Sequence, residues 1–374
     1  MIRKSAALAL LLSTTLALAD TSVTINGKAV TLPSTTQNGQ VYVNLRALAQ
    51  ALGLRLTYDA ATKRYTLGPA GATGNGQLAG GSGVVGQPYA LANSDVSPLN
   101  FTLRGAEFVA TRVNIGQEST VPAADQKLLV LHYSVQNAGK TESRFSWSSV
   151  KFTVVDDQNA NRQNVEAVGR EGSSDAVDLR LKPAQKVDVY TVIPLPAANG
   201  APKLIVQGGD QKVLRYDLHG VVKAMAAPYA DPQNPLAVRA SVPAKASSYV
   251  QVGALDLRLD RLALSDAAIG GTKPSDGHRF LIATFSVRNG SPTEQRLSYN
   301  NLQPTLRLAS GDKVTWNQTV LKAGSDESLD VRLQPGEEAK ARLYFEVPTS
   351  DPVTTLSVVQ DTSRPVEFDV SGAK

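Results

Sequence analysis

The chain has 374 residues, no cysteine and a formal net charge of +5. The lack of cysteine excludes disulfides, metal thiolates, a cysteine nucleophile and a lipid-modified N-terminal cysteine. Without the two basic residues of the N-terminal segment, Arg3 and Lys4, 36 basic and 33 acidic residues remain. This mild excess forms no basic run and no stripe with interleaved aromatics, which argues against nucleic-acid binding.

Residues 1–19 have the pattern of a secretory signal peptide. Arg3 and Lys4 precede a mostly apolar run over 6–19, and Ala17-Leu18-Ala19 has the small-x-small form of a cleavage site. The run is shorter than the roughly 20 residues that a membrane-spanning helix needs. We therefore expect export to the periplasm, the cell envelope or the extracellular space. Retention of this segment as an uncleaved anchor is the alternative.

Residues 20–67 predict a small α+β unit. Two alternating segments, 22–25 and 29–32, flank Asn26-Gly27, a strong hairpin signal. Asn44 is placed to cap a helix because its side-chain oxygen can accept from a free backbone N–H of the first turn. The helix that follows is predicted from an apolar stripe at Leu45, Leu48, Ala49 and Leu52. A final hairpin is expected around residues 59–62.

This unit resembles the copper amine oxidase N-terminal-like (stalk) domain. The resemblance rests on Ile25-Asn26-Gly27, residues 39–49 and 51–53, and Tyr58-Asp59. That family commonly has proline where this chain has Asn44. The resemblance implies an accessory envelope module. Residues 20–67 contain no His, Cys or Met, so we expect no copper site here.

The next segment, 68–98, is rich in Gly, Ala, Ser and Asn and carries almost no charge. We predict a flexible linker, with an end-to-end distance on the order of 30 Å for about 30 such residues.

The rest of the chain contains a duplication. Thr-Glu-Ser-Arg-Phe-Ser-Trp at 141–147 recurs as Thr-Glu-Gln-Arg-Leu-Ser-Tyr at 293–299, 152 residues later. The same offset relates Val135-x-Asn137 to Val287-x-Asn289. The duplicated unit, of about 120 residues, is a domain, because solenoid repeats recur every 20 to 50 residues.

Both copies have the alternating apolar pattern of short strands. Their boundaries are predicted at 99–219 and 250–371, with a Pro- and Ala-rich connector at 220–249. In the first copy the inward face is expected to carry Leu129, Leu131, Tyr133 and Val135. About seven strands per copy, without a long helical stripe, indicate an immunoglobulin-like sandwich. The predicted fold class is mainly β: two tandem immunoglobulin-like β-sandwiches preceded by a small α+β module.

The two copies also resemble uncharacterised Ig-like domains of bacterial secreted proteins. Each has a Val-x-Asn step, then Leu-x-Pro, then a strand that closes on a proline. The second and third steps are Leu181-Lys182-Pro183 and Leu195-Pro196 in the first copy, and Leu333-Gln334-Pro335 and Val347-Pro348 in the second. The resemblance implies a fold and leaves the ligand open.

Few residues suggest chemistry. His132, His219 and His278 show no ligand spacing, so we expect no metal or other cofactor. Asp157-x-Asn159-x-Asn161 matches the start of a calcium loop, but Arg162 stands where such a loop needs Gly, so a polar turn is the simpler interpretation. No arrangement of residues supports catalysis, and we predict that the protein is not an enzyme.

The repeated segment supplies the candidate binding residues. Arg144 and Trp147 in the first copy, and Arg296 and Tyr299 in the second, could anchor a partner. The alternative, which a single alternation pattern in both copies favours, places the aromatics in the sandwich cores and pairs the arginines with nearby acids.

The predicted function is that of a non-catalytic exported cell-envelope protein, for adhesion, scaffolding or association with the cell wall or surface layer. The expected partner is an envelope or cell-surface protein or a cell-wall polymer, without a nucleic acid and without a membrane span after signal cleavage. The alternative function is a ligand- or metal-binding accessory protein for envelope stress or copper handling.

Overall fold

The computed structural model describes residues 19–25, 28–52, 54–59, 63–69, 80–92, 98–209 and 212–374. The predicted signal peptide lies outside them except for Ala19, the first residue of strand β1. The chain forms two compact units, Met1–Ser82 and Gly83–Lys374. No helix of the described residues is long and apolar enough to cross a membrane.

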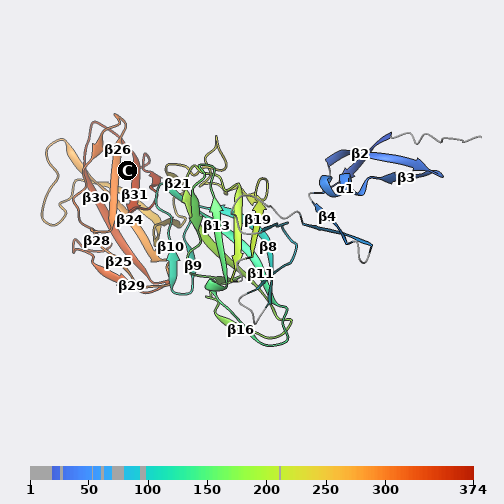
Figure 1. The fold of residues 1–374 in the computed structure, drawn as a ribbon. Coiled ribbons are helices and arrows are strands. Elements are labelled where there is room, and N and C mark those ends of the chain that lie inside the picture. The colour runs from blue at the N-terminus through green and yellow to red at the C-terminus, as the bar shows by residue number, and fades with distance from the viewer. Residues whose placement is uncertain are drawn as a thin grey trace, which may run out of the picture. The chain divides into compact units, whose positions relative to one another are not determined.

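The first unit joins an antiparallel sheet, a short helix and a hairpin (Figure 1). The side chain of Asn44 caps the helix as predicted, since its Oδ1 accepts from Arg46 N at 2.9 Å and Ala47 N at 3.1 Å. The predicted apolar stripe is only partly covered, because Ala49 is buried whereas Leu45 and Leu52 are each 38% exposed. The elements are β1 (Ala19–Ile25), β2 (Lys28–Gln37), β3 (Gln40–Val43), α1 (Leu45–Ala51), β4 (Leu54–Asp59), β5 (Arg64–Pro69) and β6 (Gly80–Ser82).

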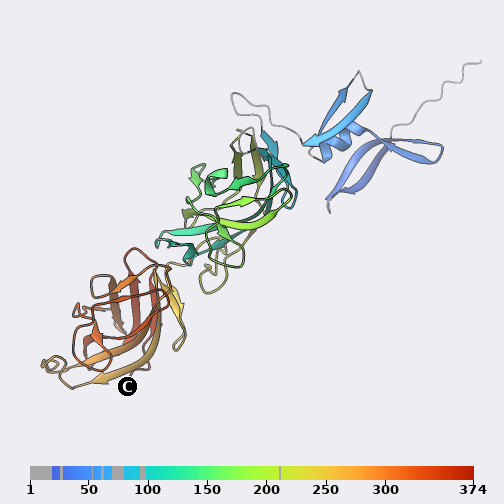
Figure 2. The same ribbon diagram turned by 90° about the horizontal axis from the view of Figure 1, so that it is seen from below.

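The second unit contains two β-sandwiches, which confirms the predicted fold class (Figures 1 and 2). One sheet of the first sandwich has the order β15-β17-β11-β8-β20, with β7 also paired to β8; the opposite sheet includes β14-β13-β18-β19. The bounds are β7 (Tyr89–Ala92), β8 (Pro98–Val109), β11 (Gln126–Asn137), β13 (Val150–Val155), β14 (Asn161–Gln163), β15 (Gly169–Arg170), β17 (Lys186–Pro196), β18 (Lys203–Gly208), β19 (Val213–Asp217) and β20 (Val222–Lys223).

The second sandwich repeats this design with sheets β22-β23-β24-β30-β28 and β21-β32-β31-β26-β27. The bounds are β21 (Val242–Ala244), β22 (Val250–Val252), β23 (Leu255–Ser265), β24 (His278–Asn289), β26 (Leu302–Leu308), β27 (Lys313–Val314), β28 (Leu321–Lys322), β30 (Glu338–Pro348), β31 (Val353–Gln360) and β32 (Val366–Asp369). Small two-stranded ladders complete the unit: β9 (Val113–Ile115) with β10 (Glu118–Thr120), β12 (Ser143–Phe145) with β16 (Leu179–Leu181), and β25 (Gln295–Leu297) with β29 (Val331–Leu333).

The predicted alternation places the core correctly. Leu129, Leu131, Tyr133 and Val135 of β11 are all 0% exposed and belong to one apolar cluster. Their counterparts at the 152-residue offset, Leu281, Ala283, Phe285 and Val287, line the second core.

The segments predicted as linker and connector also contribute strands. Within 68–98, β7 pairs with β8, and the buried side chain of Leu91 explains why this stretch packs on the sandwich. Within 220–249, β20 adds a parallel strand beside β8, and β21 adds one beside β32. Val238 and Val242 are buried in the first and second core, respectively. The apolar side chains of the connector therefore divide it between the sandwiches.

The two sandwiches contact each other through a nearly buried arginine. Arg112, in the loop between β8 and β9, donates from Nη2 to Asp256 Oδ1 at 2.6 Å and from Nε to Gly290 O at 2.9 Å. The two side chains are only 12% and 10% exposed. Ala124 N also donates to Thr362 O at 2.8 Å. Charged and backbone groups of one sandwich thus form hydrogen bonds with groups of the other.

Candidate functional site

The repeated segment forms an equivalent corner in each sandwich. We call Arg144–Ser149 with Asp178 the first corner, and Arg296–Asn301 with Asp330 the second corner. In the first, Arg144 Nε donates to Asp178 Oδ1 at 2.9 Å and Nη2 to Oδ2 at 2.5 Å. The second corner has the same two-pronged pair between Arg296 and Asp330.

The two arginines form ion pairs within the corners, so their role is structural. The hydrogen bond from Arg144 lowers the pKa of Asp178, and the equivalent bond from Arg296 lowers the pKa of Asp330. Both pairs are well exposed, so each adds little to stability. Because its guanidinium already binds a carboxylate, each arginine is poorly suited to anchor a partner's acid. The predicted pairing of the arginines with nearby acids is therefore confirmed.

The aromatic residues lie outside the cores, so the favoured interpretation of core aromatics is wrong. Trp147 is 40% exposed and Tyr299 is 48% exposed. The alternation fails because Trp147–Ser149 forms a 3₁₀ turn, in which Ser146 N donates to Ser149 Oγ at 3.1 Å. In the second copy, Ser298 N donates to Asn301 Oδ1 at 3.0 Å. Each turn presents an aromatic ring to solvent.

The core positions beside the turns belong to other residues of the motif. Phe145 and Leu297 are both 0% exposed and belong to the two cores. The motif thus separates a core residue at its fifth position from an exposed aromatic at its seventh.

Trp147 and Ser148 line two grooves of the first sandwich. The smaller groove, 200 Å³, runs over Arg144, Asp178 and the serines of the turn. The larger groove, 440 Å³, lies over the strands that follow the turn. Its lining includes Lys151, Thr153, Gln163, Asn164, Glu166 and Gln207. Trp147 therefore stands where a compact turn meets a polar sheet face.

Strand register explains why these polar side chains converge. Lys151 and Thr153 alternate along β13 with the buried Phe152 and Val154, so they face outward. Across the ladders, Thr153 opposes Gln163 of β14. Lys151 opposes Gln207 of β18. We call Lys151, Thr153, Gln163 and Gln207 the first platform.

The second sandwich carries a different set of side chains at these positions. Gln303 opposes Val359, in place of Lys151 and Gln207. Trp316 takes the place of Asn164 and packs, partly buried, against the second core. The second face is therefore more apolar and lacks one amide of the first platform.

A second candidate site lies at one end of the first sandwich, near a buried lysine. Lys127 shares the inward face of β11 with Leu129, is 0% exposed, and donates from Nζ to Leu236 O. Its Nζ lies 4.1 Å from the ring centroid of Phe108. Burial lowers the pKa of Lys127 to about 8, against an opposing effect of Asp157. Among the described residues Lys127 has no ion pair with a carboxylate; this site gave no sequence signal.

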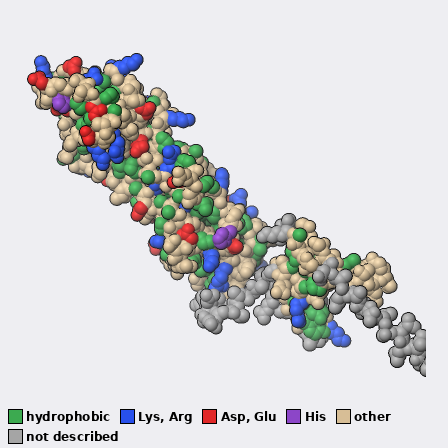
Figure 3. Space-filling model, turned by 90° about the horizontal axis from the view of Figure 1, so that it is seen from above, with side chains coloured by type: hydrophobic (Ala, Val, Ile, Leu, Met, Phe, Trp, Pro, Cys, Tyr) green, Lys and Arg blue, Asp and Glu red, His purple; other side chains and the backbone are tan. Residues whose placement is uncertain are grey.

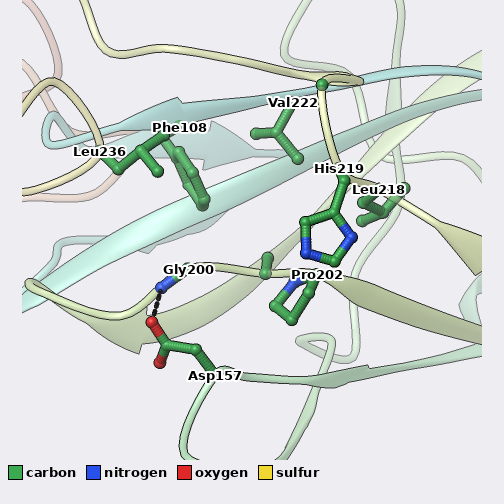
Figure 4. A pocket seen from close by; sticks show the side chains of 10 residues that line it. Phe108, Asp157, Gly200, Pro202, Leu218, His219, Val222 and Leu236 are labelled. Atoms are coloured by element: carbon green, nitrogen blue, oxygen red, sulfur yellow. Dashed lines mark hydrogen bonds between the residues drawn. The ribbon is translucent and has the colours of Figure 1, made fainter.

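A pocket of 260 Å³ adjoins this lysine (Figure 4). Phe108, Leu218, Val222 and Leu236 give it an apolar lining, and the imidazole of His219 lies among them. Asp157 lies at its edge, where Oδ2 accepts from Gly200 N at 2.9 Å. Asp157 therefore bonds to the turn at Gly200. Its own loop is the turn between the paired strands β13 and β14, as the polar-turn interpretation predicted.

His132 lies on the outer face of β11, between two carboxylates. Its Nδ1 is 2.6 Å from Glu171 Oε1, and its Nε2 is 3.5 Å from Glu107 Oε1. Because the two acids lie at opposite ring nitrogens, they do not converge with His132 on one point. Throughout the described ranges, no three His, Cys, Asp or Glu side chains are placed to hold a metal ion.

The surface charge is mixed in sign. In Figure 3, Lys and Arg side chains are interspersed with Asp and Glu over the face shown. Short-range pairs such as Arg104 with Asp188, at 2.9 Å, account for this mixture. This face therefore shows no continuous basic patch of the kind that binds nucleic acids.

The second sandwich is similar to a family of unassigned function. Residues 246–364 match the model of DUF4352, a domain of unknown function. No curated protein matches the chain.

Among the solved structures that are similar to about a third of the chain are two proteins from bacteria. One is an uncharacterised β-sandwich protein from Clostridium difficile 630, with 12% identity over 34% of this chain and 93% of that chain, at a TM-score of 0.27. The other is the secreted protein MPT63 from Mycobacterium tuberculosis, with 18% identity over 34% of this chain and 97% of that one, at a TM-score of 0.27.

Proposed function

We propose that this protein is a non-catalytic exported protein of the cell envelope, which binds an envelope partner through its sandwich corners. The observation that carries the proposal is the matched exposure of Trp147 and Tyr299, each held on a turn beside an Arg–Asp pair. An exposed aromatic on a rigid support offers large contact area at low cost in conformational entropy. Export rests on the pattern of residues 1–19.

The contact between the sandwiches supports a scaffolding role. Arg112, which bonds Asp256 and Gly290, fixes one sandwich against the other. Two binding surfaces at a fixed separation can engage a repetitive partner together, which raises the effective concentration for the second contact. We assign residues 20–67 the accessory role that their resemblance to the stalk domain implies.

The test is retention on isolated cell envelopes after fractionation of the source cells. We expect the full chain to co-sediment with envelopes, Trp147→Ala or Tyr299→Ala to weaken retention, and the double variant to abolish it. Val84→Ala removes an exposed apolar side chain away from both corners and serves as the control. A freely soluble protein that retains no envelope component would reject the proposal.

The pocket in Figure 4 favours a second candidate, an accessory protein that binds a small ligand. Its apolar lining and single imidazole match the general composition of small-molecule sites. Mass spectrometry of organic extracts, with elemental analysis for metals, tests it on protein purified at native expression. No organic compound or metal in near-stoichiometric amount would reject this candidate.

A further inference from the structure

We propose that the first platform, together with Trp147, binds an uncharged segment of a polysaccharide. This inference rests on the proposed envelope-binding function and names the chemistry of the partner. It concerns the 440 Å³ groove of the first sandwich only.

The first step of the argument is the free hydrogen-bonding capacity of the platform. The side-chain amides of Gln163 and Gln207 have no hydrogen-bond partner among the described residues, nor does the hydroxyl of Thr153. Asn164 differs, because its amide is occupied by Phe152 N at 3.1 Å and Val165 O at 2.8 Å. Amides and hydroxyls both donate and accept, as the hydroxyl groups of a sugar also do.

The second step is the position of the aromatic ring. Trp147 borders the groove and is held by the 3₁₀ turn, in which Ser149 N donates to Ser146 O at 3.0 Å. A sugar ring presents a face of C–H groups, which are apolar and slightly positive. The negative face of an indole complements such a surface. The groove thus combines an apolar plane for the sugar face with amides for its edge.

The third step is the charge of the groove. Lys151 and Glu166 are its two charged side chains within the described structure, and they balance each other. The guanidinium of Arg144 in the adjoining groove is already bound to Asp178. Nothing in this balance favours a polyanion, whereas an uncharged polymer requires no counter-charge.

The size of the face fits a short stretch of polymer. The platform extends over three adjacent strands, β14, β13 and β18, which are spaced by about 4.8 Å. The face is thus about 10 Å wide, close to the length of a disaccharide. The second sandwich offers a poorer surface because Val359 replaces Gln207 and Trp316 packs toward the core.

The experiment is isothermal titration calorimetry of the full chain with three uncharged tetrasaccharides: cellotetraose, maltotetraose and tetra-N-acetylchitotetraose. We expect at least one to bind. Trp147→Ala should lower its affinity by about tenfold or more, and Gln163→Ala or Gln207→Ala by about threefold to tenfold each. Gln303→Ala, the counterpart of Lys151 on the second face, is the matched control and should leave the affinity unchanged.

Tryptophan fluorescence gives a second readout of binding that needs no substitution in the groove. The chain has two tryptophans, so Trp316→Phe leaves Trp147 as the sole reporter, and its emission should shift when the sugar binds. The proposal is overturned if no tetrasaccharide binds, or if binding survives both Trp147→Ala and the Gln163→Ala/Gln207→Ala double variant. Envelope retention that depends on Trp147, without any sugar binding, would leave the proposed function standing and reject the glycan.

Discussion

The two sandwiches have the same frame and different surfaces. The buried Asn137 donates from Nδ2 to Thr141 O at 2.7 Å and Leu181 O at 2.8 Å. Asn289 repeats this with Thr293 O at 2.7 Å and Leu333 O at 2.9 Å. The duplicated Val-x-Asn step is therefore a device that ties a turn to a neighbouring strand, and it carries no information on a ligand.

The differences between the copies mark where each surface has its own task. Ala138 of the first copy corresponds to Gly290 of the second. A Cβ on Gly290 would lie 1.7 Å from Arg112 Nη2, so the arginine of the first sandwich needs a glycine here. The difference between Ala138 and Gly290 is therefore explained by the contact of Arg112 with the second sandwich.

The largest expected effect breaks the shared frame. Asn137→Ala should destabilise the first sandwich and Asn289→Ala the second, each by about 2–4 kcal/mol, because buried carbonyls lose their donor. Urea unfolding in single-tryptophan backgrounds measures this, since Trp147 reports on one sandwich and Trp316 on the other. Gln158→Ala, in an exposed turn, is the control. Unequal losses would show that the two turns are not equivalent.

The sequence predicted this frame because its signals are local. Alternation predicted the inward face of β11, and the side chain of Asn44 caps α1 as its position before the apolar stripe predicted. Trp147 was misplaced in the core because alternation assumes a strand, and residues 147–149 form a 3₁₀ turn instead.

Long-range contacts left no readable pattern. Arg112 and Asp256 are 144 residues apart, and no spacing rule links them. The burial of Lys127 depends on Leu236, which comes from the connector. The first platform emerged only once register placed Thr153 opposite Gln163 and Lys151 opposite Gln207. Sites built across strands need the ladder as well as the alternation.

The next effect tests the contact between the copies. Arg112→Ala leaves Asp256 paired with Arg288 at 3.0 Å, and Gly290 O bonded to Asn114 Nδ2 at 3.0 Å. The variant removes the hydrogen bonds from Arg112 to Gly253 O and Gly290 O, at an expected cost of about 1–3 kcal/mol. Gly290→Ala should cost about 1–3 kcal/mol in the wild-type chain through overlap with Arg112. The overlap disappears when Arg112 is absent.

A double-mutant cycle separates these contributions. Gly290→Ala should lower the free energy of unfolding much less in the Arg112→Ala background than in the wild type. The effect of Ala138→Gly on stability should be the same in both backgrounds. Thermal unfolding of the wild type, the two single variants and the double variant measures the coupling. Strict additivity of Arg112→Ala and Gly290→Ala would mean that the side chain of Arg112 does not occupy this place in solution.

The smallest expected effect separates the copies by pH. Asp156 has Leu308 as its counterpart, so only the first copy carries this carboxylate. Desolvation alone would raise the pKa of Asp156, but hydrogen bonds from Ala160 N, Asn199, Arg162 and Gln158 N together lower it below the ordinary value. Since the folded pKa lies below the unfolded one, the stabilisation is present above about pH 4 and is lost as the pH falls through the folded pKa.

Asp156→Asn isolates this contribution. At neutral pH the variant should lose about 1–2 kcal/mol of stability in the first sandwich, because an amide has one acceptor oxygen where the carboxylate has two. Asp156 Oδ2 accepts from Asn199 and Arg162 at 3.0 and 3.3 Å, and Oδ1 accepts from two backbone N–H groups, so one of these two sets loses its acceptor. Toward pH 2 the difference from wild type should narrow, since protonation removes the same acceptor from the native chain. Leu308→Ala in the second copy should show a loss that does not change over this range. A difference between Asp156→Asn and wild type that stays constant from pH 7 to about pH 2 would mean that the loop holds its shape without the carboxylate charge.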